Sequence, residues 1–146
     1  MDEQLINSWI NDGIRKLVRS EERRFILTSA QILALKDTPI TIVPAFLRSF
    51  IIVEGITAKN TFNSVAYTGA NALEFRYTGA AGAKVTADMA AAFINSAATA
   101  YDHVSGVATE LTPVLNAPIV AFVPTANPGT GDGTITLFIK YRLVTF

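Results

Sequence analysis

The stretch TITLFIKYRLVT at residues 134–145 decides the fold class, because its side chains alternate with the period of a β-strand. One face carries only large apolar or aromatic side chains, and the other mixes polar, charged and aromatic ones. The first face holds Ile135, Leu137, Ile139, Tyr141 and Leu143, and the second holds Thr134, Thr136, Phe138, Lys140 and Arg142. This alternation predicts a strand with one face against a protein core.

Short apolar runs separated by turn residues fill much of the chain before this strand, which is typical of a β-sandwich or jelly roll. The pattern predicts strands at 24–28, 38–44, 49–57, 61–67, 72–78, 108–111 and 119–124. It also predicts a brief helical turn at 29–35 with Ser29 as its N-cap, a helix at 87–98, and a turn-rich link at 101–107. We therefore predict a mainly β protein, with a β-sandwich or jelly-roll-like body that contains one short internal helix.

Charge is distributed unevenly along the chain. The first 24 residues hold ten of the 24 charged side chains, and the other 122 residues share fourteen. Ordinary domains carry charge on about a quarter of their residues, so the rest of the chain is poor in charge and suited to burying surface against other protein. We predict two parts, an N-terminal helical arm at 1–24 and a β-sandwich body at 25–146.

Residues 3–19 have the spacing of an amphipathic helix. Its apolar stripe consists of Ile6, Trp9, Ile10, Ile14 and Leu17. An isolated helix of this length is marginal in water, so the stripe needs a partner. Two partners are open at this point: the body of the same chain, or a neighbouring subunit. We predict that the five stripe residues form a partner interface, with Trp9, the only tryptophan, as its anchor.

Composition argues against most catalytic and ligand-binding classes. The chain has no cysteine and one histidine, His103, which argues against disulfides, thiolate chemistry and zinc sites. The net charge is zero, which disfavours electrostatic binding of nucleic acid or an anionic membrane. No signal peptide and no membrane-spanning stretch are expected.

Two motifs superficially resemble functional ones. The run Gly129-Thr-Gly-Asp-Gly133 lacks the Lys and the following helix of a phosphate-binding loop, so we interpret it as a loop between strands. Asp132 alone supplies too few oxygens for calcium. Asp102 next to His103 does not make a catalytic pair, and we interpret His103 as a surface loop residue. We predict no enzymatic activity, no cofactor and no metal.

Two segments of the chain resemble small virion structural proteins of tailed bacteriophages. They run from Leu27 to about residue 57, with the motif T-P-I-T-I-V-P, and from Asn116 to about residue 143, with G-D-G-T-I-T-L-F-I-K-Y-R. The resemblance implies a β-sandwich subunit on the outer surface of a capsid, made in the host cytoplasm. A decoration (cement) protein fits best: a homotrimer that binds the major capsid protein and stabilises the shell by extending arms onto neighbouring subunits.

Two other functions stay open from the sequence. The first is a tail, knob or fibre-base component of a phage, which contacts a host receptor or neighbouring tail proteins. That role predicts exposed loops able to bind a glycan, with 126–133 as the first candidate. The other open function is an enzyme or a small-molecule binder, which the absence of recognisable site residues in the sequence disfavours.

Overall fold

The strand predicted at 134–145 is present over its full length as β7 (Thr134–Thr145), and it lies inside a four-stranded antiparallel sheet. The computed structural model describes residues 18–107 and 111–146. The sheet has the order β1-β7-β3-β5, with β1 (Val18–Leu27), β3 (Ser49–Thr61) and β5 (Ala100–Ser105). As the alternation predicted, all five side chains of the apolar face of β7 are buried.

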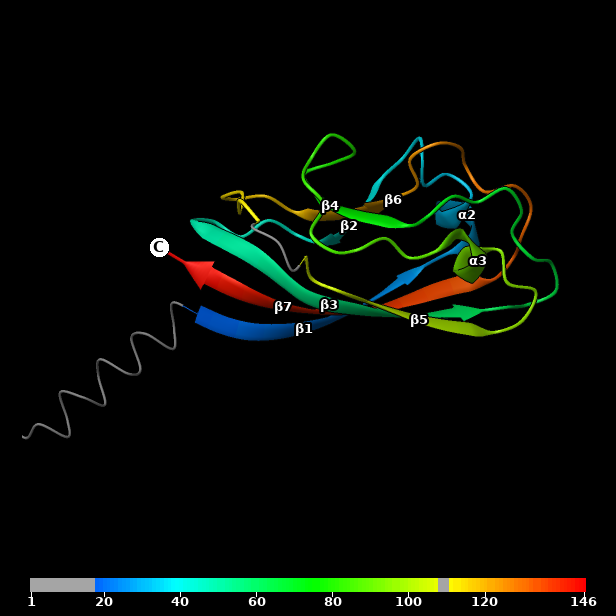
Figure 1. Cartoon of the computed structure of the whole chain (residues 1–146), viewed down its shortest axis with the longest axis horizontal. Coiled ribbons are helices and arrows are strands. Elements are labelled where there is room, and N and C mark those ends of the chain that lie inside the picture. Colours follow the sequence, from blue (N-terminus) through cyan, green and yellow to red (C-terminus); the bar gives the residue numbers. More distant parts are fainter. Residues whose placement is uncertain (1–17, 108–110) are drawn as a thin grey trace, which may run out of the picture.

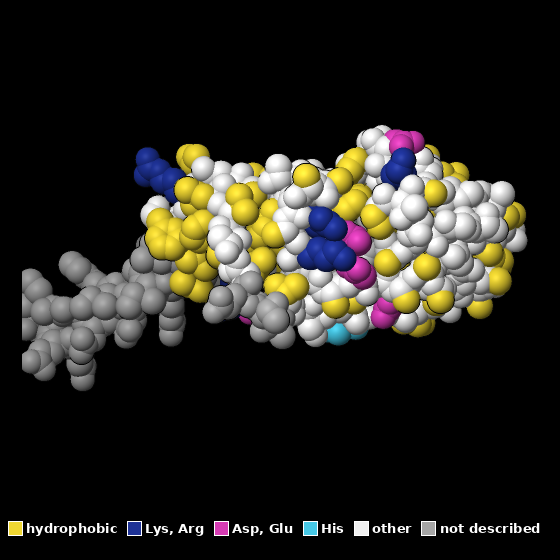
Figure 2. Space-filling view, turned by 45° about the horizontal axis from the view of Figure 1, so that its top comes forward, with side chains coloured by type: hydrophobic (Ala, Val, Ile, Leu, Met, Phe, Trp, Pro, Cys, Tyr) yellow, Lys and Arg dark blue, Asp and Glu magenta, His cyan; other side chains and the backbone are white. Residues whose placement is uncertain are grey.

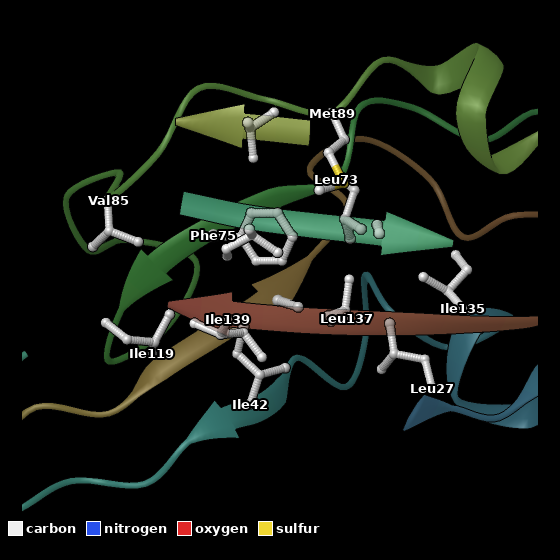
Figure 3. Close-up of a cluster of buried hydrophobic side chains, with 14 of the residues drawn as sticks. Leu27, Ile42, Leu73, Phe75, Val85, Met89, Ile119, Ile135, Leu137 and Ile139 are labelled. Atoms are coloured by element: carbon white, nitrogen blue, oxygen red, sulfur yellow. The ribbon is translucent and has the colours of Figure 1, made fainter. Parts of the chain in front are cut away.

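A second sheet packs over the first, so that the described residues form a two-layer β-sandwich (Figure 1). Its order is β2-β6-β4, with β2 (Ile40–Val43), β6 (Ile119–Phe122) and β4 (Glu74–Tyr77). The core between the sheets is almost entirely aliphatic and aromatic. In Figure 3, Leu137 and Ile139 of β7 lie close to Phe75 of β4 and Ile119 of β6. The predicted β-sandwich is confirmed, and the two sheets together contain seven strands within the described residues.

The first strand begins at Val18, earlier than the sequence predicts. The sequence predicts a helical arm up to residue 24, but residues 18–27 pair with β7 in an unbroken register from Val18–Val144 to Leu27–Ile135. The charged run gives no strand periodicity, and pairing with the β7 backbone decides the conformation. Charged side chains also suit an edge strand, because they oppose pairing with a further strand. The part of the predicted arm before Val18 lies outside the described residues.

The internal helix is shorter than predicted. α3 covers only Ala91–Ile94 instead of 87–98. Shortly before it, Met89 exchanges two backbone hydrogen bonds with Leu73, of 2.9 and 3.0 Å. This bridge holds the chain extended beside β4, so the helix propensity of the alanines acts only after it. No side chain caps the helix at Ala90.

Three further local predictions need correction. β5 occupies the predicted turn-rich link, because an edge strand with a largely polar sequence carries little apolar periodicity. Helix α2 (Ser29–Ile32) is capped by Thr28 and not by Ser29, through a capping box with Gln31. Residues 61–67 form no strand beyond the end of β3. The strand predicted at 108–111 lies largely outside the described residues.

Candidate protein-interaction surface

The five residues predicted to form a partner interface, Ile6, Trp9, Ile10, Ile14 and Leu17, lie outside the described residues. Their role therefore stays a prediction. The described residues offer two other surfaces, a groove on the outer face of the four-stranded sheet and an apolar patch at one end of the sandwich.

The groove has a volume of about 630 Å³ and crosses all four strands of the first sheet. Its central row follows the strand register from Arg24 of β1 through Phe138 of β7 and Thr57 of β3 to His103 of β5. The Arg24 guanidinium lies 6.0 Å from the centre of the Phe138 ring, within range of a cation–π contact. The face is therefore mixed, with an exposed aromatic ring between charged and polar groups.

His103 lies on β5 and is exposed, so its predicted surface position is confirmed while its predicted loop is wrong. Its Nδ1 is hydrogen-bonded to the Thr57 hydroxyl at 2.8 Å. The Asp102 carboxylate accepts a hydrogen bond from the backbone amide of His103 at 2.8 Å. Gly55 leaves room for the imidazole, since a Cβ there would lie 3.0 Å from His103 Cε1. The carboxylate thus binds the backbone and not the ring, and this is not the geometry of a catalytic pair.

The second surface, which we call the end patch, consists of Leu47, Phe50, Val114, Leu115 and Phe146. The rings of Phe50 and Phe146 pack edge to face with centroids 5.2 Å apart. Two hydrogen bonds bring the segments together: the amide of Phe146 donates to the Arg48 carbonyl at 2.9 Å, and that of Asn116 donates to the Ser49 carbonyl at 3.0 Å. Figure 2 shows hydrophobic side chains gathered at this end.

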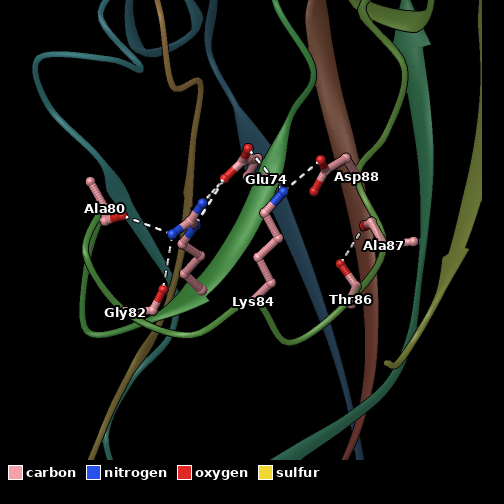
Figure 4. A network of polar contacts seen from close by, with 8 residues as sticks. Glu74, Ala80, Gly82, Lys84, Thr86, Ala87 and Asp88 are labelled. Atoms are coloured by element: carbon pink, nitrogen blue, oxygen red, sulfur yellow. Dashed lines mark hydrogen bonds and ion pairs between the residues drawn. The ribbon is translucent and has the colours of Figure 1, made fainter. Parts of the chain in front are cut away.

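A network of charges on the outer side of the second sheet is structural. The buried Glu74 carboxylate accepts a hydrogen bond of 2.8 Å from Nε of Arg76, and Nη2 of Arg76 forms an ion pair with it at 2.6 Å (Figure 4). Lys84 Nζ lies 3.2 Å from the same carboxylate. Lys84 also pairs with Asp88 at 2.7 Å. The Arg76 guanidinium covers the Phe122 ring at 5.3 Å. The two positive and two negative side chains are paired with one another. The network therefore covers the outer side of the sheet and leaves no charged group open to a ligand.

The Gly-rich loop is fixed by Asp132, whose carboxylate holds the segment that was predicted as a strand at 61–67. Asp132 Oδ1 accepts hydrogen bonds from the amides of Ser64 and Val65, at 3.0 and 2.8 Å. Oδ2 accepts hydrogen bonds from the Ser64 hydroxyl at 2.6 Å and from the side-chain Nδ2 of Asn63 at 2.8 Å. Side-chain bonds thus replace the ladder bonds of a strand. With four donors around it, the carboxylate is an internal anchor.

Because these hydrogen bonds favour its ionised form, the pKa of Asp132 is well below its ordinary value of 3.8, with the Ser64 hydroxyl as the largest cause. A lowered pKa in the fold means that the carboxylate stabilises the fold above the ordinary pKa and loses this effect as the pH falls. We expect the Asp132→Asn variant to be less stable than the wild type at neutral pH, and the difference to shrink below about pH 4. Thermal unfolding followed by circular dichroism between about pH 7 and pH 2 measures this.

The exposed Glu22 of β1 provides the control for this prediction. Glu22→Gln removes a surface carboxylate without such contacts and should be about as stable as the wild type at neutral pH. A constant difference between Asp132→Asn and wild type over the whole range would contradict the anchoring role of the ionised carboxylate.

The part of the chain that the structure describes contains neither a cluster of metal ligands nor a membrane-spanning helix. Among residues 18–107 and 111–146, no three His, Asp or Glu side chains are grouped so that they could hold a metal ion. In the same residues, no helix has the length and apolar character needed to cross a membrane.

Comparison with known proteins gives matches in structure only. No protein-family model and no curated protein matches the sequence. A chain in the capsid of Ralstonia phage GP4 superposes with a TM-score of 0.52 and 16% identity, over 88% of this chain and 85% of that chain. The two chains share a fold. A chain of the capsid asymmetric unit of cyanophage Pam1 gives a TM-score of 0.48 and 17% identity, over 86% and 84% of the two chains.

Sequence reasoning missed both surfaces of the described body. The residues of the end patch come from three separate segments, and each looks like an ordinary strand or turn residue in the sequence. For the groove, the alternation of β7 placed Phe138 on the polar face, and an aromatic residue there was the one available signal.

Proposed function

We propose that this protein is a structural subunit of a phage virion, a decoration (cement) protein that binds the outer surface of the capsid and stabilises it. The observation that carries the proposal is the fold shared with a chain of the GP4 phage capsid, which extends over most of both chains. The phage-like strand motifs at 27–57 and 116–143 support it. The role requires no chemistry at a reacting centre, so the protein is proposed not to be an enzyme.

The proposed partners are the major capsid protein and further copies of this chain, arranged as a homotrimer. A cement subunit gains from several weak contacts at once, because one contact holds the others at high effective concentration. Two features of the surface support multiple contacts: the end patch and the mixed groove face lie on different parts of the body. The arm, with its apolar stripe, is proposed as a further contact.

The test is binding of the full chain to empty capsids of the same phage. We expect occupancy at regular lattice positions by electron microscopy and a raised temperature of shell disruption. Deletion of residues 1–17 should weaken attachment by tenfold or more while leaving the body folded. The deletion must stop at residue 17, because removal of Val18 onward takes away strand β1.

Two controls accompany this experiment. Ser8→Ala, on the face of the predicted helix opposite the stripe, should bind like the wild type. Far-ultraviolet circular dichroism verifies that the deleted chain retains its sandwich. A folded wild-type chain that binds no capsid would overturn the cement role and favour a tail component.

A further inference from the structure

The end patch is the most exposed group of large apolar side chains in the described residues. Leu47 is 80% exposed and Phe146 is 73% exposed, and Leu115 and Val114 are about half exposed. Scattered single apolar residues are normal on a protein surface, but contiguous ones mark sites of interaction. This cluster lies where β7 ends and β3 begins, and backbone hydrogen bonds from Phe146 to Arg48 and from Asn116 to Ser49 hold its segments together.

The start of β1 lies beside this patch. Val18 pairs with Val144 of β7, and Val144 pairs in turn with Phe50 of β3. Residues 1–17 therefore join the sandwich at the same end. Their sequence carries the apolar stripe Ile6, Trp9, Ile10, Ile14 and Leu17. As a helix, the segment from Ile6 to Leu17 would be about 18 Å long. The segment with the apolar stripe is thus attached to the same end of the sandwich that carries the end patch.

A short connection limits how the stripe of a chain can reach its own end patch. The stripe runs to Leu17, and Val18 is already paired with β7. Reversals between consecutive elements usually take 2–6 residues. A helix that extends to Leu17, as the spacing predicts, leaves no residue for a turn back over its own sandwich.

We propose that the end patch of one copy binds the apolar stripe of residues 1–17 of a second copy. The proposal rests on the arm of the proposed function and names the neighbour that it binds. The contact is heterologous, because it joins two different surfaces. When only two copies associate through one such contact, one stripe and one patch stay free. A closed ring satisfies all of them, and three copies give the proposed homotrimer.

Engineered cysteines test the occupant directly, because the chain contains no cysteine of its own. One full-length chain carries Ile10→Cys and a second, distinguishable by mass, carries Leu47→Cys. After mixing and mild oxidation, we expect the disulfide-linked pair of unequal chains as the main product. The control is Tyr101→Cys in place of Leu47→Cys, since Tyr101 is 71% exposed on β5 at a distance from the patch. That mixture should give several-fold less linked pair.

Two results would overturn the proposal. The first concerns a variant that carries both Ile10→Cys and Leu47→Cys on one chain. If its disulfide forms only within the monomer and no linked dimer appears, the patch binds the arm of the same chain. The second is the absence of an arm-to-patch disulfide in either arrangement, since then another surface covers the patch.

Sedimentation of the full chain without capsids gives an independent measurement. We expect a defined oligomer for the wild type, and a dissociation constant raised tenfold or more by Leu47→Glu and by Trp9→Ala. Tyr101→Glu and Ser8→Ala should leave it unchanged. If the chain forms oligomers but binds no capsid, the cement role is refuted and the contact between arm and end patch stands. If the chain is a monomer and binds capsids, that contact is refuted and the cement role stands.

Discussion

Replacement of Phe75 by alanine is expected to lower the free energy of unfolding by about 3–5 kcal/mol, the upper range for truncation of a single core side chain. Phe75 is fully buried, and it lies on β4 among side chains of both sheets (Figure 3). Its truncation removes apolar burial and leaves a cavity between two hydrogen-bonded layers that cannot collapse freely. For a domain with an ordinary stability of about 5–15 kcal/mol, the loss is a large fraction of the total.

Denaturation in urea, followed by far-ultraviolet circular dichroism, measures this loss. The matched control is Phe138→Ala, which truncates the same side chain at a half-exposed position on β7. It should cost about 1 kcal/mol or less. Protein concentration must be held constant, because self-association stabilises the folded state. Equal losses for the two variants would contradict the placement of Phe75 in the core.

Gly131→Ala is expected to produce the second largest loss, about 2–4 kcal/mol. Gly131 has a φ of +96°, in a region that residues with a side chain rarely adopt. A Cβ there would lie 2.3 Å from Cδ1 of Tyr67. The Tyr67 ring cannot move aside easily, because it is buried and its hydroxyl donates a 2.6 Å hydrogen bond to the Gly133 carbonyl. Burial, together with a smaller effect of Asp132, raises the pKa of Tyr67 to about 12.

The control for this substitution is Gly69→Ala. Gly69 also has a positive φ, of +63°, but a Cβ there would meet nothing within 4 Å. It should cost about 1 kcal/mol, the conformational penalty alone. Chemical denaturation compares the two variants. If Gly131→Ala were no more damaging than Gly69→Ala, the close packing of the loop on Tyr67 would be refuted.

Clear periodicity or strong chain breakers made part of the fold predictable from sequence. β7 alternates along its whole length, and β2 is bounded by Pro39 and Pro44, so both were found. β1 and β5 are edge strands, and polar or charged residues give them little periodic signal. Their conformation follows from pairing with distant strands, which a local pattern does not contain.

The candidate surfaces show the same limit. Leu47, Val114 and Phe146 are far apart in the sequence, and only the completed sandwich brings them to one end. The predicted arm is different, because its stripe is local and visible as helical spacing. The sequence therefore predicted one binding element, and the fold supplied a second apolar surface, which is the proposed partner of the first on another copy.

The position of β7 has a consequence for biosynthesis. β1 and β3 are each hydrogen-bonded to β7 and not to one another, so they remain separate until the last strand of the sandwich has left the ribosome. Until then, both β1 and one side of β3 present backbone groups that are not paired with another strand, and such nascent species are prone to aggregate. The charged side chains of β1 are expected to oppose such wrong pairing during this interval. Folding dominated by such distant pairings is expected to be slow.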